Sequence, residues 1–211
     1  MARRVRPLSV DLAQELPAEC VGCAFWETEG RLPRHCGASC DLDLLKGWIR
    51  QVIEQWGDCG RVITVDDEVV AFLKYAPATM VPQARHFPSG PPSEDAVLLT
   101  CLHIVDDARH LGLGRVLLHA CFRDLLKRGH KVVESFAFDG HVAELPVLSL
   151  EFLLKEGFQV VRPHPEFPLL RLNLRSLATV MENVEAALQS IQMPLRVPSR
   201  APVPRIEPGK R

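Results

Sequence analysis

The sequence has no apolar run long enough to cross a bilayer. The longest runs, such as residues 69–73 and 116–118, are far shorter than the roughly 20 residues that a membrane-spanning helix needs. Residues 1–6 are not followed by the apolar core of a signal peptide. We therefore expect a cytoplasmic protein that does not associate with membranes.

A net positive charge is also missing. The formal net charge is -1 at pH 7, so the sequence lacks the positive field that drives binding to phosphate backbones irrespective of base sequence. It also lacks the Gly-Lys-Ser/Thr of a P-loop and the wider fingerprint of dinucleotide-binding proteins. These absences argue against a nucleic-acid partner and against those nucleotide-binding classes. The length of 211 residues, 47% of them hydrophobic, suits one globular domain.

The seven cysteines lack a regular disulfide spacing. Their number is odd, and in a reducing cell they are expected to be thiols or metal ligands. Cys20-x2-Cys23 and Cys36-x3-Cys40 lie 12 residues apart, and two such pairs can close a tetrahedral zinc site, with His35 as a substitute ligand. The x3 spacing of the second pair favours separate thiols instead. We predict no metal site and keep zinc as the alternative.

Periodicity predicts a mixed α/β (α+β) order of elements. The predicted helices are 41–56, ending at Gly57, then 114–127, 145–156 and 177–191. The predicted strands are 61–65, 69–75, 96–105, 131–138, 158–161 and 169–174. The first two strands are expected to form a hairpin, and the proline-rich residues 76–95 are expected to form a long loop.

Four segments follow from this order. Residues 1–40 are a cysteine-containing segment expected to pack on the domain, which covers residues 41–174. Residues 175–193 hold the C-terminal helix, which packs either on the domain or on a partner, and a homodimer is one such arrangement. The proline-rich residues 194–211 are expected to be a disordered or extended tail.

The loop Arg109-His110-Leu111-Gly112-Leu113-Gly114 lies between an apolar strand and a helix. The first N–H groups of a helix have no partner within it, and the helix dipole favours an anion at that end. Glycines at 112 and 114 remove side chains that would keep a pyrophosphate away from these groups. A tight turn that only packs the helix on the sheet is the alternative.

This loop and the strand before it, residues 102–105, resemble the coenzyme A motif of the GCN5-related N-acetyltransferase (GNAT) family. The segments 129–133 and 151–158 resemble the helix-to-strand step and the later helix ending in Gly-Phe of that family. The resemblance covers residues 41–174. In addition, residues 20–27 are similar to the opening of a subgroup found in actinobacteria.

The resemblance implies a mixed, mostly antiparallel sheet of six to seven strands, flanked by helices and splayed at an acetyl-CoA site. Backbone N–H groups of residues 112–115 would hold the pyrophosphate, and the backbone around Ile104 would polarise the thioester carbonyl. Arg109 and Arg115 would add phosphate contacts. The predicted coenzyme-binding residues are Leu102, Ile104, Val105, Arg109, His110, Leu111, Gly112, Leu113, Gly114 and Arg115.

The family's tyrosine acid has no counterpart, because its place is taken by Leu153 and the only tyrosine is Tyr75. Ser149, one predicted helical turn earlier, is the candidate acid, with an ordinary helix serine as the alternative. Alternatively, the thiolate leaves without the help of an acid. The candidate bases are Glu134, His103, and Glu94 or Asp95, and we place Glu134 first. His103 points to the opposite face of its strand from its neighbours, and the alternative is a partly buried structural histidine.

The resemblance therefore implies an N-acetyltransferase. Such an enzyme transfers the acetyl group of acetyl-CoA by direct attack of a primary amine of a small molecule, peptide or protein. The alternative, favoured by the missing tyrosine, is a non-catalytic regulatory module that binds acetyl-CoA.

Overall fold

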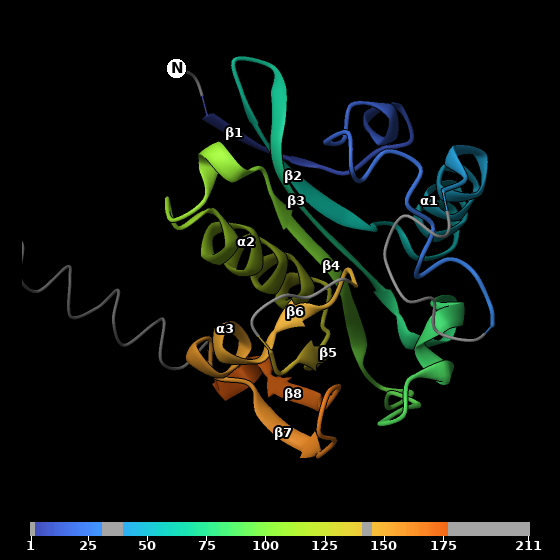
Figure 1. Ribbon diagram of the computed structural model, residues 1–211, viewed down its shortest axis with the longest axis vertical. Helices are drawn as coiled ribbons and strands as arrows, with labels where there is room; N and C mark the ends of the chain where they lie inside the picture. Colours follow the sequence, from blue (N-terminus) through green and yellow to red (C-terminus); the bar gives the residue numbers. More distant parts are fainter. Residues whose placement is uncertain (1–2, 31–39, 141–144, 177–211) are drawn as a thin grey trace, which may run out of the picture. The chain divides into compact units, whose positions relative to one another are not determined.

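The structure is a computed structural model that describes residues 3–30, 40–140 and 145–176 (Figure 1). These residues belong to one compact unit. The predicted helix 177–191, the tail, His35 and Cys36 lie outside the described residues.

One eight-stranded sheet forms the centre of the fold. Its strands are β1 (Arg3–Pro7), β2 (Gly60–Val65), β3 (Glu68–Pro77), β4 (Val97–Ile104), β5 (Val132–Phe138), β6 (Leu148–Ser149), β7 (Gln159–Arg162) and β8 (Leu169–Asn173). The order across the sheet is β1-β2-β3-β4-β5-β8-β7, and β6 pairs with β5. All neighbours are antiparallel except β4 with β5 and β5 with β6. The predicted mixed, mostly antiparallel fold is thus confirmed, and the two strands that were not predicted are β1 and β6.

Helix α1 (Leu42–Trp56) begins and ends where the sequence predicts. The Asp41 side chain accepts a hydrogen bond from the Leu44 N–H, and Gly57 closes the helix with φ 94°, a backbone conformation that glycine adopts without strain. The face formed by Leu45, Trp48 and similar residues is buried. Helix α1 therefore packs on the sheet through this apolar face.

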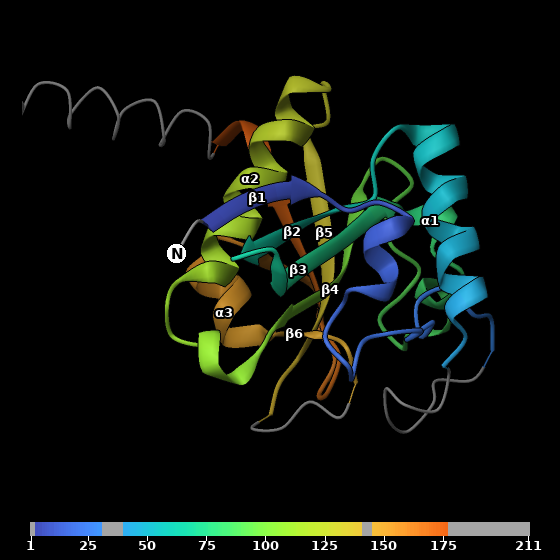
Figure 2. The ribbon, with the colours of Figure 1, turned by 90° about the horizontal axis from the view of Figure 1, so that it is seen from above.

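The two long helices cover opposite faces of the sheet (Figure 2). Helix α2 (Leu113–Lys127) packs on β2, β3 and β4. Successive residues of β3 point to opposite faces: Lys74 lies 5.7 Å from the centre of the Trp48 ring on α1, and Tyr75 faces the other way, toward Cys121 of α2. Each face of the central strands is therefore covered by a different helix.

The two central strands separate after a short stretch of pairing. β4 pairs with β5 only through Val97–Leu99, although β4 continues to Ile104. Beyond Leu99, β4 is paired with β3 alone, and the register shifts by one residue at Thr100. The last two residues of β5 pair with β6 instead, so among the described residues the backbone of residues 100–104 has a strand partner only in β3.

An aromatic cluster anchors the N-terminal segment and the proline-rich loop. Trp26 stacks on Phe87 with ring centres 5.0 Å apart, and Phe87 stacks on Phe136 of β5 at 4.2 Å. Residues 78–86 form two 3₁₀ turns, η3 (Ala78–Met80) and η4 (Pro82–His86). Residues 8–26 thus contribute to the same core as the sheet.

The predicted helix 145–156 is wrong in its first half, because α3 covers only Leu150–Lys155. Pro146 lies outside any helix and its carbonyl accepts the Trp26 Nε1–H at 3.0 Å, while residues 148–149 pair with β5. Apolar spacing alone could not show that this segment is held by tertiary contacts. None of the helices within the described ranges is long and apolar enough to span a membrane.

Candidate functional site

The loop from Arg109 to Gly112 brings a row of backbone N–H groups to the start of α2. His110 and Gly112 both have positive φ angles, of 62° and 74°, and the first helical hydrogen bond runs from the Val116 N–H to the Gly112 carbonyl. Within the described part of the chain, no protein acceptor faces the N–H groups of residues 110–115. Such a row of amides at a helix N-terminus is a favourable place for an anion.

The two glycines of the loop have different structural reasons. Gly112 has φ +74° and open space where a Cβ would lie, so it supplies a left-handed conformation that side chains disfavour. A Cβ on Gly114 would lie 3.3 Å from the ring of Phe152 and 3.4 Å from Leu102. Gly114 therefore allows α2, α3 and β4 to approach closely, which is a packing reason.

A cleft of about 330 Å³ lies against this loop. It is lined by Leu102, Ile104, His110, Gly112, Leu113, Gly114, Arg115, Phe152, Lys155 and Glu156. Seven of the ten predicted coenzyme-binding residues lie here, from the end of β4 and the start of α2. The cleft opens beside the stretch of β4 that lacks a second strand partner, so backbone groups of β4 and amides of α2 face one region.

Three predicted residues do not line the cleft. Leu111 is 59% exposed, and Arg109 lies over the loop, where its guanidinium is 2.9 Å from Asp106 and 3.4 Å from the carbonyl oxygen of Ile104. The Val105 N–H is bound to the Val70 carbonyl of β3. These residues shape the loop, whereas the cleft itself is made by their neighbours.

Basic side chains gather at the cleft. His110, Arg115 and Lys155 line it together with one acid, Glu156. The buried Glu156 carboxylate accepts a hydrogen bond from Arg115 Nε at 2.8 Å, and Glu156 also lies 3.5 Å from His119. Lys155 is in turn paired with the exposed Glu151 at 2.5 Å. The free amides of residues 110–115, together with these basic side chains, make the cleft suited to a polyanionic ligand. Phe152, Lys155 and Glu156 were not predicted as site residues, although the family resemblance at 151–158 pointed to their helix.

The structure places Glu134 away from this cleft. Its buried carboxylate accepts hydrogen bonds from the Ser93 N–H and hydroxyl, both at 2.8 Å, and from Arg171 at 2.8 Å. Arg171 in turn binds Asp95 at 2.9 Å. Glu134 thus ties the end of the proline-rich loop to β5 and β8. Glu94 is not among the residues that line the cleft.

His103 lies on the face of β4 opposite to the cleft. Its Nε2 atom is 2.9 Å from the Glu19 carboxylate, although the ring N–H does not aim at that oxygen, and the ring stacks on Phe72 at 5.9 Å. Ser149 is the N-cap of α3, and its hydroxyl accepts the Phe152 N–H at 3.4 Å. Neither residue lines the cleft.

Neither the family's tyrosine position nor the only tyrosine reaches the cleft. Leu153 is fully buried. Tyr75 is also fully buried, on the α2 side of the sheet, and its hydroxyl donates to Asp58 at 2.7 Å. Burial, together with Cys121 and Asp58, raises the pKa of Tyr75 well above its usual range. Both side chains are therefore part of the core.

Among the described residues, Cys20, Cys59, Cys101 and Cys121 carry free thiols. Cys20 and Cys23 are buried, and residues Cys23 and Cys40 form an isolated β-bridge. Burial raises the pKa of the Cys20 thiol, and the neighbouring Cys101 adds to this effect. Among the described residues, which omit Cys36 and His35, no group of three or more His, Cys, Asp or Glu side chains could hold a metal ion.

The sequence matches no protein-family model and no curated protein. The fold, however, is shared with solved N-acetyltransferase structures. YncA of Salmonella typhimurium, a putative acetyltransferase solved with its cofactor acetyl-CoA, superposes with a TM-score of 0.56 at 15% identity, over 82% of this chain and 95% of that one. The PaiA N-acetyltransferase of Thermoplasma acidophilum, in complex with coenzyme A, gives a TM-score of 0.51 at 15% identity, over 82% and 99%.

The ribosomal-protein-S18-alanine N-acetyltransferase of Escherichia coli gives a TM-score of 0.51 at 13% identity, over 82% of this chain and 94% of that one. Identities this low establish the fold and leave the activity to be argued from the site. The fold of this chain is therefore that of the GNAT acetyltransferases, including the splayed sheet that the resemblance implied.

Proposed function

We propose that the protein is a GNAT-family N-acetyltransferase that transfers an acetyl group from acetyl-CoA to a primary amine. One observation carries the proposal: the row of N–H groups at residues 110–115 lies beside the part of β4 that has separated from β5. The first feature suits a pyrophosphate and the second suits an extended chain with amide groups. Coenzyme A contains both, joined in one molecule.

The fit can be examined group by group. Amides of residues 112–115, the Arg115 and Lys155 cations and the His110 imidazole lie where a pyrophosphate would be held. Alternate residues of β4 between positions 100 and 104 direct their N–H and C=O groups toward the opening. Leu102, Ile104 and Phe152 supply an apolar wall for the alkyl portion. The residues present therefore fit acetyl-CoA.

Acetyl-CoA supplies a thioester, whose carbonyl carbon is attacked by an amine and whose thiolate leaves. The part of this chain is to hold the thioester against β4 and to direct backbone N–H groups at its carbonyl oxygen, where negative charge develops. Holding the amine and the thioester in reacting positions contributes the larger share of the rate, since a general acid typically adds about 10²- to 10⁴-fold. The absence of a tyrosine from the cleft thus lowers the rate without removing the reaction.

A non-catalytic acetyl-CoA-binding module is the second candidate. It is favoured by the burial of Leu153 and by the lack of a tyrosine, serine or cysteine among the residues that line the cleft. Incubation with acetyl-CoA and a panel of amines and peptides, with thiol release as the readout, separates the two candidates. Thiol release that depends on the amine supports the enzyme, whereas binding without release supports the module.

The replacement Tyr75→Phe is expected to leave acetyl transfer nearly unchanged. It removes a hydrogen bond to the buried Asp58, so the free energy of unfolding should fall by about 1–2 kcal/mol. Urea denaturation measures the stability, and thiol release per folded molecule measures the activity. Loss of turnover with intact acetyl-CoA affinity would mean that Tyr75 reaches the sulfur and that the cleft is assigned wrongly.

The contacts of Glu134 support a positioning role over the base role. In Glu134→Gln, one amide N–H₂ group would face the Ser93 and Arg171 donors that the carboxylate now accepts, so we expect a loss of about 2–3 kcal/mol in unfolding free energy. The pH profile of turnover, corrected for folded protein, should keep its shape. A displaced alkaline limb in this variant would instead support Glu134 as the base.

A further inference from the structure

A buried carboxylate lies in the wall of the cleft at the start of α2. It belongs to Glu156, the residue that follows α3, and its side chain is 5% exposed. The backbone is fixed at this place, because the Gly157 N–H binds the Leu154 carbonyl at 3.1 Å and Gly157 has φ 91°, a helix end that glycine adopts without strain. Helix α3 therefore ends with this acid at a fixed place beside α2.

An acid is unfavourable at this place for three reasons. Burial removes the carboxylate from water, and the end of a helix carries the negative end of its dipole. The cleft is also proposed to hold the phosphates of acetyl-CoA, which a negative charge repels. A neutral or apolar side chain would avoid all three costs, so the contacts of Glu156 must explain why an acid is present.

Glu156 contacts two side chains of α2 that lie about one helical turn apart. Its Oε1 atom accepts a hydrogen bond from Arg115 Nε at 2.8 Å, and its Oε2 atom lies 3.5 Å from His119 Nε2. Among the residues that the structure describes, no acceptor contacts Nη1 or Nη2 of Arg115, whose side chain is 61% exposed and lines the cleft. The carboxylate thus fixes the guanidinium through Nε and leaves its other N–H groups for a ligand.

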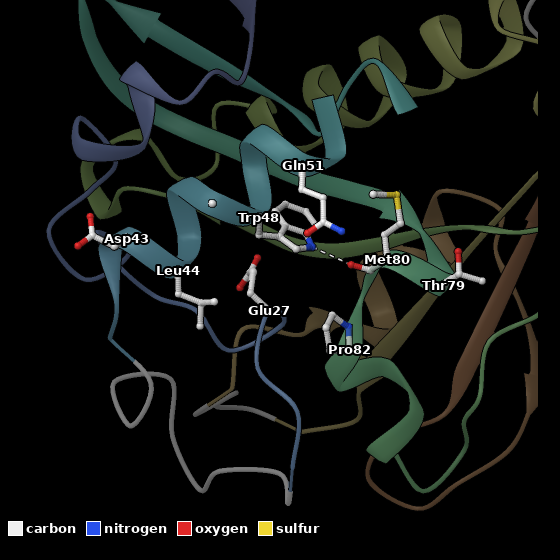
Figure 3. A pocket seen from close by; sticks show the side chains of 9 residues that line it. Glu27, Asp43, Leu44, Trp48, Gln51, Thr79, Met80 and Pro82 are labelled. Carbon is white, nitrogen blue, oxygen red and sulfur yellow. Dashed lines mark hydrogen bonds between the residues drawn. The ribbon is translucent and has the colours of Figure 1, made fainter. Parts of the chain in front are cut away.

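A second buried ion pair shows a different arrangement. Glu27 lies on the wall of another cleft, of about 460 Å³, which Trp48 of α1 also lines (Figure 3). The Glu27 Oε1 atom accepts a hydrogen bond from Lys74 Nζ at 2.7 Å, and the two side chains are 0% and 4% exposed. Lys74 is not among the residues that line that cleft, so this pair belongs to the core. The pair of Glu156 differs because its cation is mostly exposed and lines the cleft.

We infer that Glu156 is a positioning residue for the coenzyme, which holds the Arg115 guanidinium and leaves its Nη groups to the phosphates of acetyl-CoA. The inference rests on the proposed function, because it needs acetyl-CoA in this cleft. A free arginine side chain loses conformational freedom when it binds a phosphate, whereas one that is already held by Nε has less to lose. This gain in affinity exceeds the repulsion between Glu156 and the phosphates.

The test uses Glu156→Met, which removes the charge and the acceptor, and Glu156→Gln, which keeps an oxygen acceptor for Arg115 Nε. Calorimetric titration should show that Glu156→Met binds acetyl-CoA about threefold to tenfold more weakly, the range expected for the freedom of one long side chain. Glu156→Gln should retain most of the affinity. Glu151→Gln is the control for charge, since Glu151 is an exposed acid of the same helix that does not line the cleft. It should bind acetyl-CoA at least as tightly as the parent.

The Arg115→Met background separates a positioning role from a purely structural one. If Glu156 acts through Arg115, the double variant Arg115→Met/Glu156→Met should bind acetyl-CoA at least as tightly as Arg115→Met, because an acid without its arginine only repels phosphate. A general loosening of α3 would instead weaken acetyl-CoA binding by the same factor in both backgrounds, and this result would overturn the inference.

Two further results would overturn the inference while leaving the proposed function intact. One is acetyl-CoA binding by Glu156→Met that is as tight as in the parent or tighter, and the other is a loss of affinity in Glu156→Gln that equals the loss in Glu156→Met. The expected pattern of affinities without thiol release from any amine would refute only the acetyl transfer. A parent protein that does not bind acetyl-CoA would refute both.

Discussion

Gly112→Val is expected to weaken acetyl-CoA binding about 100-fold while the protein remains folded. Gly112 has φ +74° at the first turn of α2, a conformation that is strained for a β-branched residue. The loop would relieve this strain by leaving the left-handed region, which turns the amides of residues 112–115 away from the pyrophosphate. Each hydrogen bond to a charged group contributes about 1.5–3 kcal/mol, so the loss of one or two gives the expected factor. Calorimetric titration with acetyl-CoA measures it.

Gly129→Val is the matched control. Gly129 follows the other end of α2, has φ +83° and has no atom within 4 Å of a Cβ position, so it should impose similar backbone strain far from the loop. Both variants should lose comparable unfolding free energy in urea, and only Gly112→Val should lose acetyl-CoA affinity. Equal acetyl-CoA affinities in the two variants would show that the pyrophosphate does not bind at this loop.

Glu27→Gln is expected to lower the free energy of unfolding by about 3–5 kcal/mol. The replacement leaves the Lys74 ammonium, which is 4% exposed, without a counter-charge, and breaking a buried ion pair by removing one partner is strongly destabilising. Urea denaturation measures the change. Glu29→Gln is the control, because Glu29 and its partner Arg85 are 3.5 Å apart and both are more than half exposed; it should cost less than about 1 kcal/mol.

The double variant Glu27→Gln/Lys74→Met separates the ion pair from packing. Methionine keeps much of the lysine volume without the charge, so the double variant should regain at least half of the lost stability. A double variant that is less stable than Glu27→Gln would show that Lys74 is held by other groups.

The sequence alone predicted most of the order of elements and a glycine-containing loop at the start of a helix, because these depend on neighbours in the chain. The coenzyme role of that loop was implied by the family resemblance and stays a prediction. Periodic apolar residues, the Asp41 cap and Gly57 set the limits of α1, and the strand-loop-helix order around Gly112 places N–H groups at a helix start whatever packs around them. The hairpin of β2 and β3 also followed from local signals. The loop prediction combined the backbone chemistry of a helix start with the resemblance to the coenzyme A motif.

Long-range contacts decided what the sequence could not. The strand β1 has five exposed residues and exists because β2 offers it an open edge, and α3 starts at Leu150 because β5 and Trp26 hold the residues before it. We predicted Glu134 as a candidate base because it interrupts an apolar strand, and a carboxylate on an interior strand usually faces solvent or a cleft. Its partners Ser93 and Arg171 are 41 and 37 residues away, and no local pattern could reveal them.

The buried ion pair of Glu27 and Lys74 likewise had no sequence signal, because the two residues are 47 residues apart in the chain. The sequence by itself determined which backbone groups are left free at the start of α2, because helix geometry leaves them free in any fold. Tertiary structure alone decided which side chains surround those groups and where carboxylates are buried, because burial and pairing depend on residues that are distant in the chain.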